Sequence, residues 1–143
     1  MSGNPDLQEL ARLDGRYDAQ AFGFVGEGLR HAAKLYGKDT PGCVERHLTA
    51  TQLVEGVLEL AVERFGMLAE LVLRSWGVRR SEDVGSITFL FIEHGVFSKQ
   101  PSDRLEDFSG GPSFGPELAV RACRRLELVG DGAGPARAGG ANA

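Results

Sequence analysis

The sequence predicts a mainly α fold with a small β element (α+β), on three observations. Apolar residues recur at spacings of three and four in several segments, which is the period of one helix face. Capping residues (Ser, Thr, Asp or Asn) precede these segments, and glycine follows them. The chain has 143 residues, 42% of them hydrophobic, which suits one core and one domain. We therefore expect a compact helical domain.

The first predicted helix is short and lies in residues 1–13, ahead of the main domain. Asn4 is its expected N-cap and Pro5 its first residue, because Pro is favoured where the backbone N–H has no helical partner. The helix is expected to end at Asp14 and Gly15. This segment is expected to dock on the main body.

A longer helix is expected between Asp18, its N-cap, and Gly37, which has the usual C-terminal position. Its apolar face consists of Phe22, Val25, Leu29, Ala32 and Tyr36. Glycines within it weaken the helix by about 1 kcal/mol each relative to alanine. Two explanations for Gly23 and Gly26 stay open: close approach of another element, or drift in a glycine-rich chain.

The next helical region follows a loop at residues 38–48. Thr49 and Gln52 have the spacing of a capping box, in which each side chain binds the backbone N–H of the other residue. The apolar phase continues past Gly66 as far as Trp76. Residues 49–76 are therefore one kinked helix or two helices with a tight turn at Gly66, and the second arrangement is favoured.

The third helix of the main domain is expected over residues 82–94. Ser81 is its predicted N-cap, and Glu82 and Asp83 suit the positive end of the helix dipole. Its apolar residues lie on more than one face, so it should be mostly buried, and Gly95 ends it. Residues 96–99 and 104–108 can pair as a hairpin that leans on the helices.

Helix, helix, helix and hairpin is the order of a winged-helix module. Residues 14–108 are therefore predicted to form a single winged-helix-like domain. Residues 109–129 are expected to be a linker and a short helix that begins at Pro116. Residues 130–143 are rich in Gly and Ala and have almost no large apolar side chains, which predicts a disordered C-terminal tail.

Several short blocks of residues resemble, in their order and spacing, an uncharacterised family of small conserved-hypothetical bacterial proteins of planctomycete and verrucomicrobial type. The blocks are Arg16-Tyr17, Ala21-Phe22, Arg46-His47-Leu48-Thr49, Phe65-Gly66, Trp76-Gly77-Val78, Asp83-Val84-Gly85 with Ile87, Asp103, and Asp107-Phe108. The similarity covers residues 14–108. It implies a cytoplasmic bacterial protein, and it brings no activity, cofactor or catalytic residue.

Charge and cysteine content narrow the class of protein. The formal net charge is −4, which removes the electrostatic attraction that nucleic-acid binders ordinarily use. No apolar run reaches the ~18–20 residues needed to cross a bilayer, and the N-terminus lacks the apolar region of a signal peptide. Cys43 and Cys123 are expected to be free thiols. We therefore predict a cytoplasmic protein without membrane association.

No catalytic residue, cofactor site or metal site is predicted. His31, His47 and His94 lack the spacing of metal ligands, and no nucleophile motif is present. Asp103, Glu106 and Asp107 are interpreted as a solvated acidic hairpin, because a Mg²⁺ or Ca²⁺ site needs several converging oxygens. An enzyme is therefore not expected.

Polar residues near helix starts and on the hairpin are the candidate interaction or phosphate-contact positions. They are Arg16, Tyr17, Arg46, His47, Arg79, Arg80, Lys99 and Arg104. The first four stand just before two helices, whose N-termini attract anions. The alternative is structural: the arginines pair with acidic side chains, and the aromatic rings lie at the edge of the core.

The predicted function is a non-catalytic protein-interaction or regulatory module that binds a protein partner or itself. A DNA-binding regulator of winged-helix type is one alternative, with Arg79, Arg80, Lys99 and Arg104 on phosphates. Its reading helix, residues 82–94, has no Lys or Arg and offers only Ser86, Thr88 and Glu93 to bases. An enzyme of unrecognised class is the other alternative.

Overall fold

The computed structural model describes residues 6–38, 48–95 and 104–132, and their regular elements are all helical. These elements are α1 (Leu7–Asp14), α2 (Ala19–Leu35), α3 (Ala50–Phe65), η1 (Gly66–Leu68), α4 (Ala69–Ser75), α5 (Ser81–Glu93), η2 (Leu105–Phe108) and α6 (Phe114–Gly132). Within the described ranges, the β contact is one isolated antiparallel bridge between Arg80 and Ser113. The predicted mainly α class is confirmed. None of the described helices is long and apolar enough to span a membrane.

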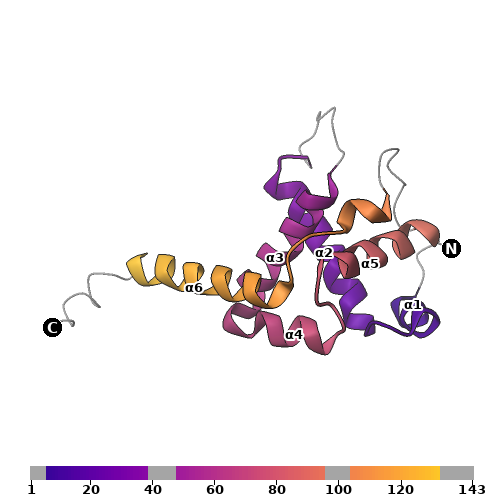
Figure 1. The fold of residues 1–143 in the computed structure, drawn as a ribbon, viewed down its shortest axis with the longest axis horizontal. Coiled ribbons are helices and arrows are strands. Elements are labelled where there is room, and N and C mark those ends of the chain that lie inside the picture. Colours follow the sequence, from indigo (N-terminus) through magenta and orange to yellow (C-terminus); the bar gives the residue numbers. More distant parts are fainter. Residues whose placement is uncertain (1–5, 39–47, 96–103, 133–143) are drawn as a thin grey trace.

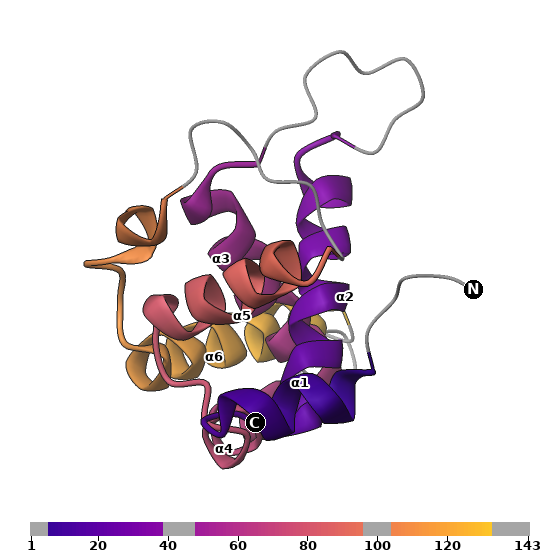
Figure 2. The same cartoon turned by 90° about the vertical axis from the view of Figure 1, so that its right-hand side faces the viewer.

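Two helices, α2 and α3, form the centre of the fold (Figure 1). The N-terminal helix α1 packs on α2, and α5 packs on both α2 and α3 (Figure 2). The helices α4 and α6 also pack on α3 and on each other. The C-terminal part of α6 extends away from the remaining helices (Figure 1).

The contact between α2 and α3 depends on glycines from both helices. A Cβ atom on Gly56 would lie 2.4 Å from the Cβ of Ala32, and one on Gly28 would lie 2.7 Å from Cγ2 of Val57. Distances this short are steric overlaps, so the two backbones approach as closely as they do only because neither position carries a side chain. The glycines that allow close approach are therefore Gly28 and Gly56. Gly23 has only ordinary van der Waals contact around it.

The helix caps follow the sequence patterns in most places. Asp18 accepts a hydrogen bond from the backbone N–H of Gln20 at 2.9 Å, and Thr49 and Gln52 form the predicted capping box. The first helix differs: it begins at Leu7, and Asp6 is its N-cap. The predicted cap Asn4 and the following Pro5 lie outside the described residues.

Residues 49–76 form two helices, as favoured from the sequence. The α3 helix ends at Phe65, and the single 3₁₀ turn η1 leads into α4. Gly66 has φ +55°, a conformation in which a side chain would be strained, so the chain changes direction at this residue. The change of direction turns Met67 and Leu68 away from the core, and both side chains are exposed.

The predicted hairpin is wrong in its second strand, because residues 105–108 form the 3₁₀ helix η2. Two interactions favour the helical turn. The carboxylate of Asp107 accepts a hydrogen bond from the backbone N–H of Arg104 at 3.0 Å, which closes the turn locally. Phe108 is buried against Gly85 of α5, at a spot where any side chain on residue 85 would collide with its ring. The predicted first strand, residues 96–99, lies outside the described residues, so the winged-helix-like detail is not confirmed.

The last helix is longer than predicted and belongs to the core. It begins at Phe114 instead of Pro116 and runs for 19 residues. Phe114, Leu118 and Ala122 are buried against α3, η1 and α4, so this part of the chain completes the same hydrophobic core. Of the predicted disordered tail, residues 130–132 are the end of α6, and residues 133–143 lie outside the described residues.

Candidate functional site

Several of the predicted polar residues meet at Asp83, in the first turn of α5. Its Oδ1 accepts a hydrogen bond from the hydroxyl of Tyr17 at 2.7 Å. Its Oδ2 accepts from the backbone N–H groups of Arg79 at 2.8 Å and Arg80 at 3.1 Å. The N-cap of α5 is Arg80, which corrects the prediction that Ser81 is the N-cap, and Asp83 closes the helix start from its first turn. Ser81 is the first residue of the helix.

Tyr17 and Arg16 have the arrangement expected of structural residues. Burial, together with the hydrogen bond to Asp83, raises the pKa of Tyr17 to about 12, so its phenol stays neutral. The Tyr17 ring packs edge-on against Phe22. The Arg16 guanidinium lies 5.1 Å from the centroid of the Tyr17 ring and forms a 2.8 Å ion pair with Asp14. The polar groups of Tyr17 and Arg16 are therefore bound to other residues of the fold.

Only half of the six remaining predicted positions lie in the part of the chain that the structure describes. Arg46, His47 and Lys99 lie outside the described residues. The side chains of Arg79 and Arg80 are exposed, and in the described part of the chain neither has an ion pair. Arg104 is exposed at the start of η2, and its backbone N–H is bound by Asp107. Among the described residues, the phosphate-contact interpretation therefore rests on Arg79, Arg80 and Arg104, whose side chains are exposed.

The α5 helix is mostly buried, as its sequence predicts. Val84, Ile87 and Phe91 are in the core. Thr88, one of the three candidates for reading bases, is also buried, and its hydroxyl donates to the carbonyl oxygen of Val84 at 2.8 Å. A helix that enters a DNA groove must present its polar side chains outward. The position of α5 therefore gives the DNA-binding alternative no support.

We expect Asp83→Ala to lower the free energy of unfolding by about 2 kcal/mol, because one carboxylate that binds both the backbone N–H groups ahead of α5 and the buried Tyr17 hydroxyl is lost. Chemical unfolding followed by circular dichroism measures this change. Glu93→Ala is the matched control, since Glu93 is an exposed acid on the same helix and its removal should be nearly neutral. Equal stability of the two variants would show that Asp83 does not hold the two segments together.

Metal-ligating and nucleophilic side chains are scattered. The described residues contain no group of three or more His, Cys, Asp or Glu side chains that could hold a metal ion. The His31 Nε2 atom lies 3.9 Å from a carboxylate oxygen of Glu63. Cys123 is an exposed thiol on α6, and Cys43 lies outside the described residues. These groups suggest no catalytic arrangement.

Arg121 of α6 is the centre of an ion cluster that sequence patterns did not single out. Its guanidinium donates to both carboxylate oxygens of Glu55, at 2.6 and 2.9 Å, and to Glu117 at 2.9 Å. It also forms an ion pair with Glu59. The hydrogen bond to Glu55 and the surrounding carboxylates raise the pKa of Arg121, against the effect of burial. Two spacings of four residues in the sequence, Glu55 to Glu59 and Glu117 to Arg121, could have indicated this cluster.

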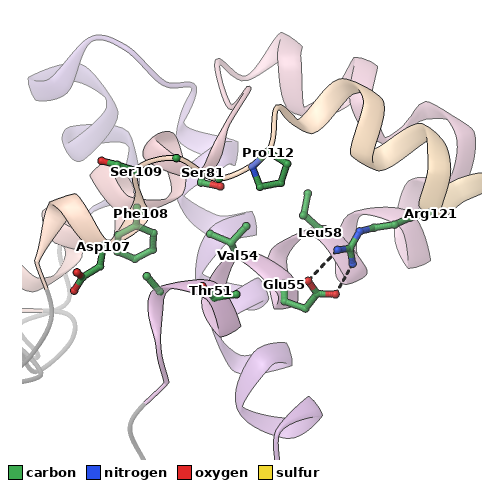
Figure 3. Close-up of a pocket in the computed structure, with 13 residues that line it drawn as sticks. Thr51, Val54, Glu55, Leu58, Ser81, Asp107, Phe108, Ser109, Pro112 and Arg121 are labelled. Carbon is green, nitrogen blue, oxygen red and sulfur yellow. Dashed lines mark hydrogen bonds and ion pairs between the residues drawn. The ribbon is translucent and has the colours of Figure 1, made fainter.

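A cleft of about 210 Å³ lies beside this cluster, between α3 and the chain that joins η2 to α6 (Figure 3). Val54 and Leu58 of α3 form one wall, and Phe108 and Pro112 face them. Its polar lining includes Thr51, Glu55, Ser81, Asp107 and Arg121. The cleft therefore combines an apolar body with polar groups from four separate parts of the chain.

A second surface feature lies where α6 packs on η1 and α4. Met67, Leu68 and Leu71 are 59%, 60% and 53% exposed. Met67 also lines a groove of about 400 Å³, together with Gly66, Glu70, Gly115, Leu118, Ala119 and Ala122, and Leu68 and Leu71 are its exposed neighbours in the chain. Leu126 is exposed one helical turn beyond Ala122 on the same side of α6. We call Met67, Leu68, Leu71, Ala119 and Leu126 the α4–α6 surface.

Comparisons with known proteins add nothing to this description. No protein family, curated protein or solved structure matches the chain. The resemblance to small bacterial proteins described above therefore stays a prediction. Any function has to be argued from the geometry of the chain itself.

Proposed function

We propose that this protein is a non-catalytic protein-interaction module that uses the α4–α6 surface as its contact. The observation that carries the proposal is the exposure of three large apolar side chains, Met67, Leu68 and Leu71, within five residues. Single exposed apolar residues are normal, but a group of them beside a groove is typical of a protein-binding surface. The buried groups of the same elements, such as Leu73 and Leu118, already complete the core.

The shape and composition of this region support the same function. The α6 helix extends beyond the body (Figure 1), so a partner can contact both the groove and the free part of the helix. Leu and Met side chains next to an apolar groove supply the buried centre that protein interfaces need. The charged groups here are few: Glu70 lines the groove, and it is paired with Arg74 at 3.0 Å. Little desolvation of charge would oppose binding.

Replacing Leu68 and Leu71 together by glutamate should abolish the association, because two charges would be buried in the contact. Light scattering measures self-association, and retention of proteins from a bacterial lysate measures binding to other partners. The fold should survive, since both side chains point into solvent.

Leu13→Glu with Leu105→Glu is the matched control, because these leucines are equally exposed on α1 and η2, away from the surface. It should associate as the unchanged chain does. A chain that is strictly monomeric and retains no partner would overturn the proposal. So would equal behaviour of the two double variants.

A further inference from the structure

Ser81 carries a buried hydroxyl that has no hydrogen-bond partner among the residues that the structure describes. The residue is only 3% exposed. The other buried polar side chain, Thr88, follows the usual rule and donates to a backbone carbonyl. Buried hydroxyls are nearly always hydrogen-bonded, because leaving one unpaired is unfavourable. The exception at Ser81 therefore indicates a position where another molecule completes the hydrogen bonding.

Ser81 is one of the residues that line the cleft beside α3. Gly111 lies directly on the serine: a Cβ atom there would be 2.1 Å from the Ser81 Oγ. The backbone of residue 111 therefore covers one side of the hydroxyl, and Ser81 lines the cleft together with Val54 and Pro112 (Figure 3). At about 210 Å³, the cleft is larger than the ~30 Å³ of one water and smaller than the ~300 Å³ at which drug-sized sites begin. It suits a small molecule.

The charges of the cleft select a cation over an anion. Two of its lining residues, Glu55 and Asp107, are carboxylates, and its lining cation is Arg121. The guanidinium of Arg121 is shared among Glu55, Glu59 and Glu117, so the cluster keeps an excess of negative charge. A cleft with this excess raises the local concentration of positive ligands and repels carboxylates and phosphates.

We propose that this cleft binds a small organic amine in its protonated form. The alkyl part of the amine lies on Val54, Leu58 and Pro112. Glu55 and Asp107 attract the positive charge, and the Ser81 hydroxyl accepts a hydrogen bond from the ligand. This chemistry is carried by a free alkylamine and by a lysine side chain. The proposal does not depend on the α4–α6 surface, which lies on other residues.

The direct test is a titration of the full chain with n-pentylammonium, followed by amide chemical shifts in NMR. We expect saturable shifts confined to residues 51–58, 81–82 and 107–112, with millimolar affinity that falls as salt is added. Pentanoate has the same alkyl chain with the opposite charge and should cause no such shifts. A parallel titration with Nα-acetyl-lysine N-methylamide distinguishes the sources: tighter binding than n-pentylammonium favours a lysine side chain, and weaker binding favours a free amine.

Ser81→Ala separates ligand binding from folding. Removing a hydroxyl that has no partner should leave the unfolding midpoint unchanged or raise it, whereas affinity for n-pentylammonium should fall about tenfold, the value of one hydrogen bond to a charged group. Ser113→Ala, an exposed serine outside the cleft, should bind as the unchanged chain does. Asp107→Asn keeps an oxygen for the Arg104 N–H and removes one charge, so it should weaken binding and leave the turn intact.

Three results would overturn the proposal. The first is the absence of saturable shifts in the cleft, and the second is equal binding of pentanoate. The third is unchanged affinity in both Ser81→Ala and Asp107→Asn. The association of the Leu68 and Leu71 variant tests the proposed function alone. The proposed function and the proposed amine site can therefore be contradicted independently.

Discussion

Gly56→Ala should lower the free energy of unfolding by about 3 kcal/mol or more, which is the upper range for overpacking a core. The new methyl group would overlap the Cβ of Ala32 at 2.4 Å and the carbonyl oxygen of Gly28 at 2.7 Å. One of the contacts is backbone, so no side chain can move aside to relieve it. The central helices α2 and α3 would have to separate, and the loss is large against a typical total of 5–15 kcal/mol. Urea unfolding followed by circular dichroism measures it.

Gly26→Ala is the control for this effect. Gly26 also lies within α2, but a Cβ there would meet only the ring of Phe91, at an ordinary 3.9 Å. Alanine should therefore stabilise the helix by about 0.5–1 kcal/mol, the usual difference between the two residues. If Gly56→Ala were as stable as Gly26→Ala, the spacing of α2 and α3 would not depend on glycine.

Arg121→Met should lower the free energy of unfolding by about 2 kcal/mol at pH 7. The side chain is only 12% exposed, and its removal leaves Glu55, Glu59 and Glu117 facing one another without a cation. The value lies between the small effect of a surface pair and the 3–5 kcal/mol of a buried pair, because the carboxylates are about one-third exposed. Arg124→Met is the control: Arg124 is an exposed residue of the same helix and should be nearly neutral.

The pH dependence of the stability of Arg121→Met tests whether the loss of stability comes from the lost charge interactions. The hydrogen bond from Arg121 holds the pKa of Glu55 below its ordinary 4.5, despite partial burial. A group with a lowered folded pKa stabilises the protein above its unfolded pKa and loses that contribution as the pH falls through the folded value. The difference between the unchanged chain and Arg121→Met should therefore be constant near neutral pH and shrink below about pH 4.5. A difference that persists at pH 2–3 would point to packing instead of charge.

Much of the fold could be predicted because its signals are local. The capping box of Thr49 and Gln52 and the cap at Asp18 are hydrogen bonds between residues at most three positions apart. The turn at Gly66 follows from the conformational freedom of one residue. The burial of α5 follows from apolar side chains on several of its faces. Such features depend on short stretches of chain, and a short stretch of sequence contains them completely.

The predictions that were wrong, and the features that were not predicted, depend on contacts between residues that are distant in the sequence. Residues 104–108 were predicted to be the second strand of a hairpin, but Phe108 fits against Gly85 and Asp107 closes a 3₁₀ turn. Ser81 has the residue type of an N-cap, yet Arg80 occupies that position and the carboxylate of Asp83 binds the backbone N–H groups of Arg79 and Arg80. The same carboxylate also binds Tyr17, 66 positions away. No local pattern reports which distant partner a side chain meets.

The sequence by itself determined that this protein is mainly helical, where most of its helices begin and end, and that α5 is buried without a basic residue. The tertiary structure alone decided which glycines bring α2 and α3 together and that α6 completes the core. It also decided that Arg121 meets Glu55, again 66 positions away, beside a cleft lined by Ser81, whose hydroxyl has no hydrogen-bond partner among the described residues. The physical reason is the range of the interactions: helix periodicity and caps act within a turn, whereas packing, ion clusters and clefts exist only after distant segments come together.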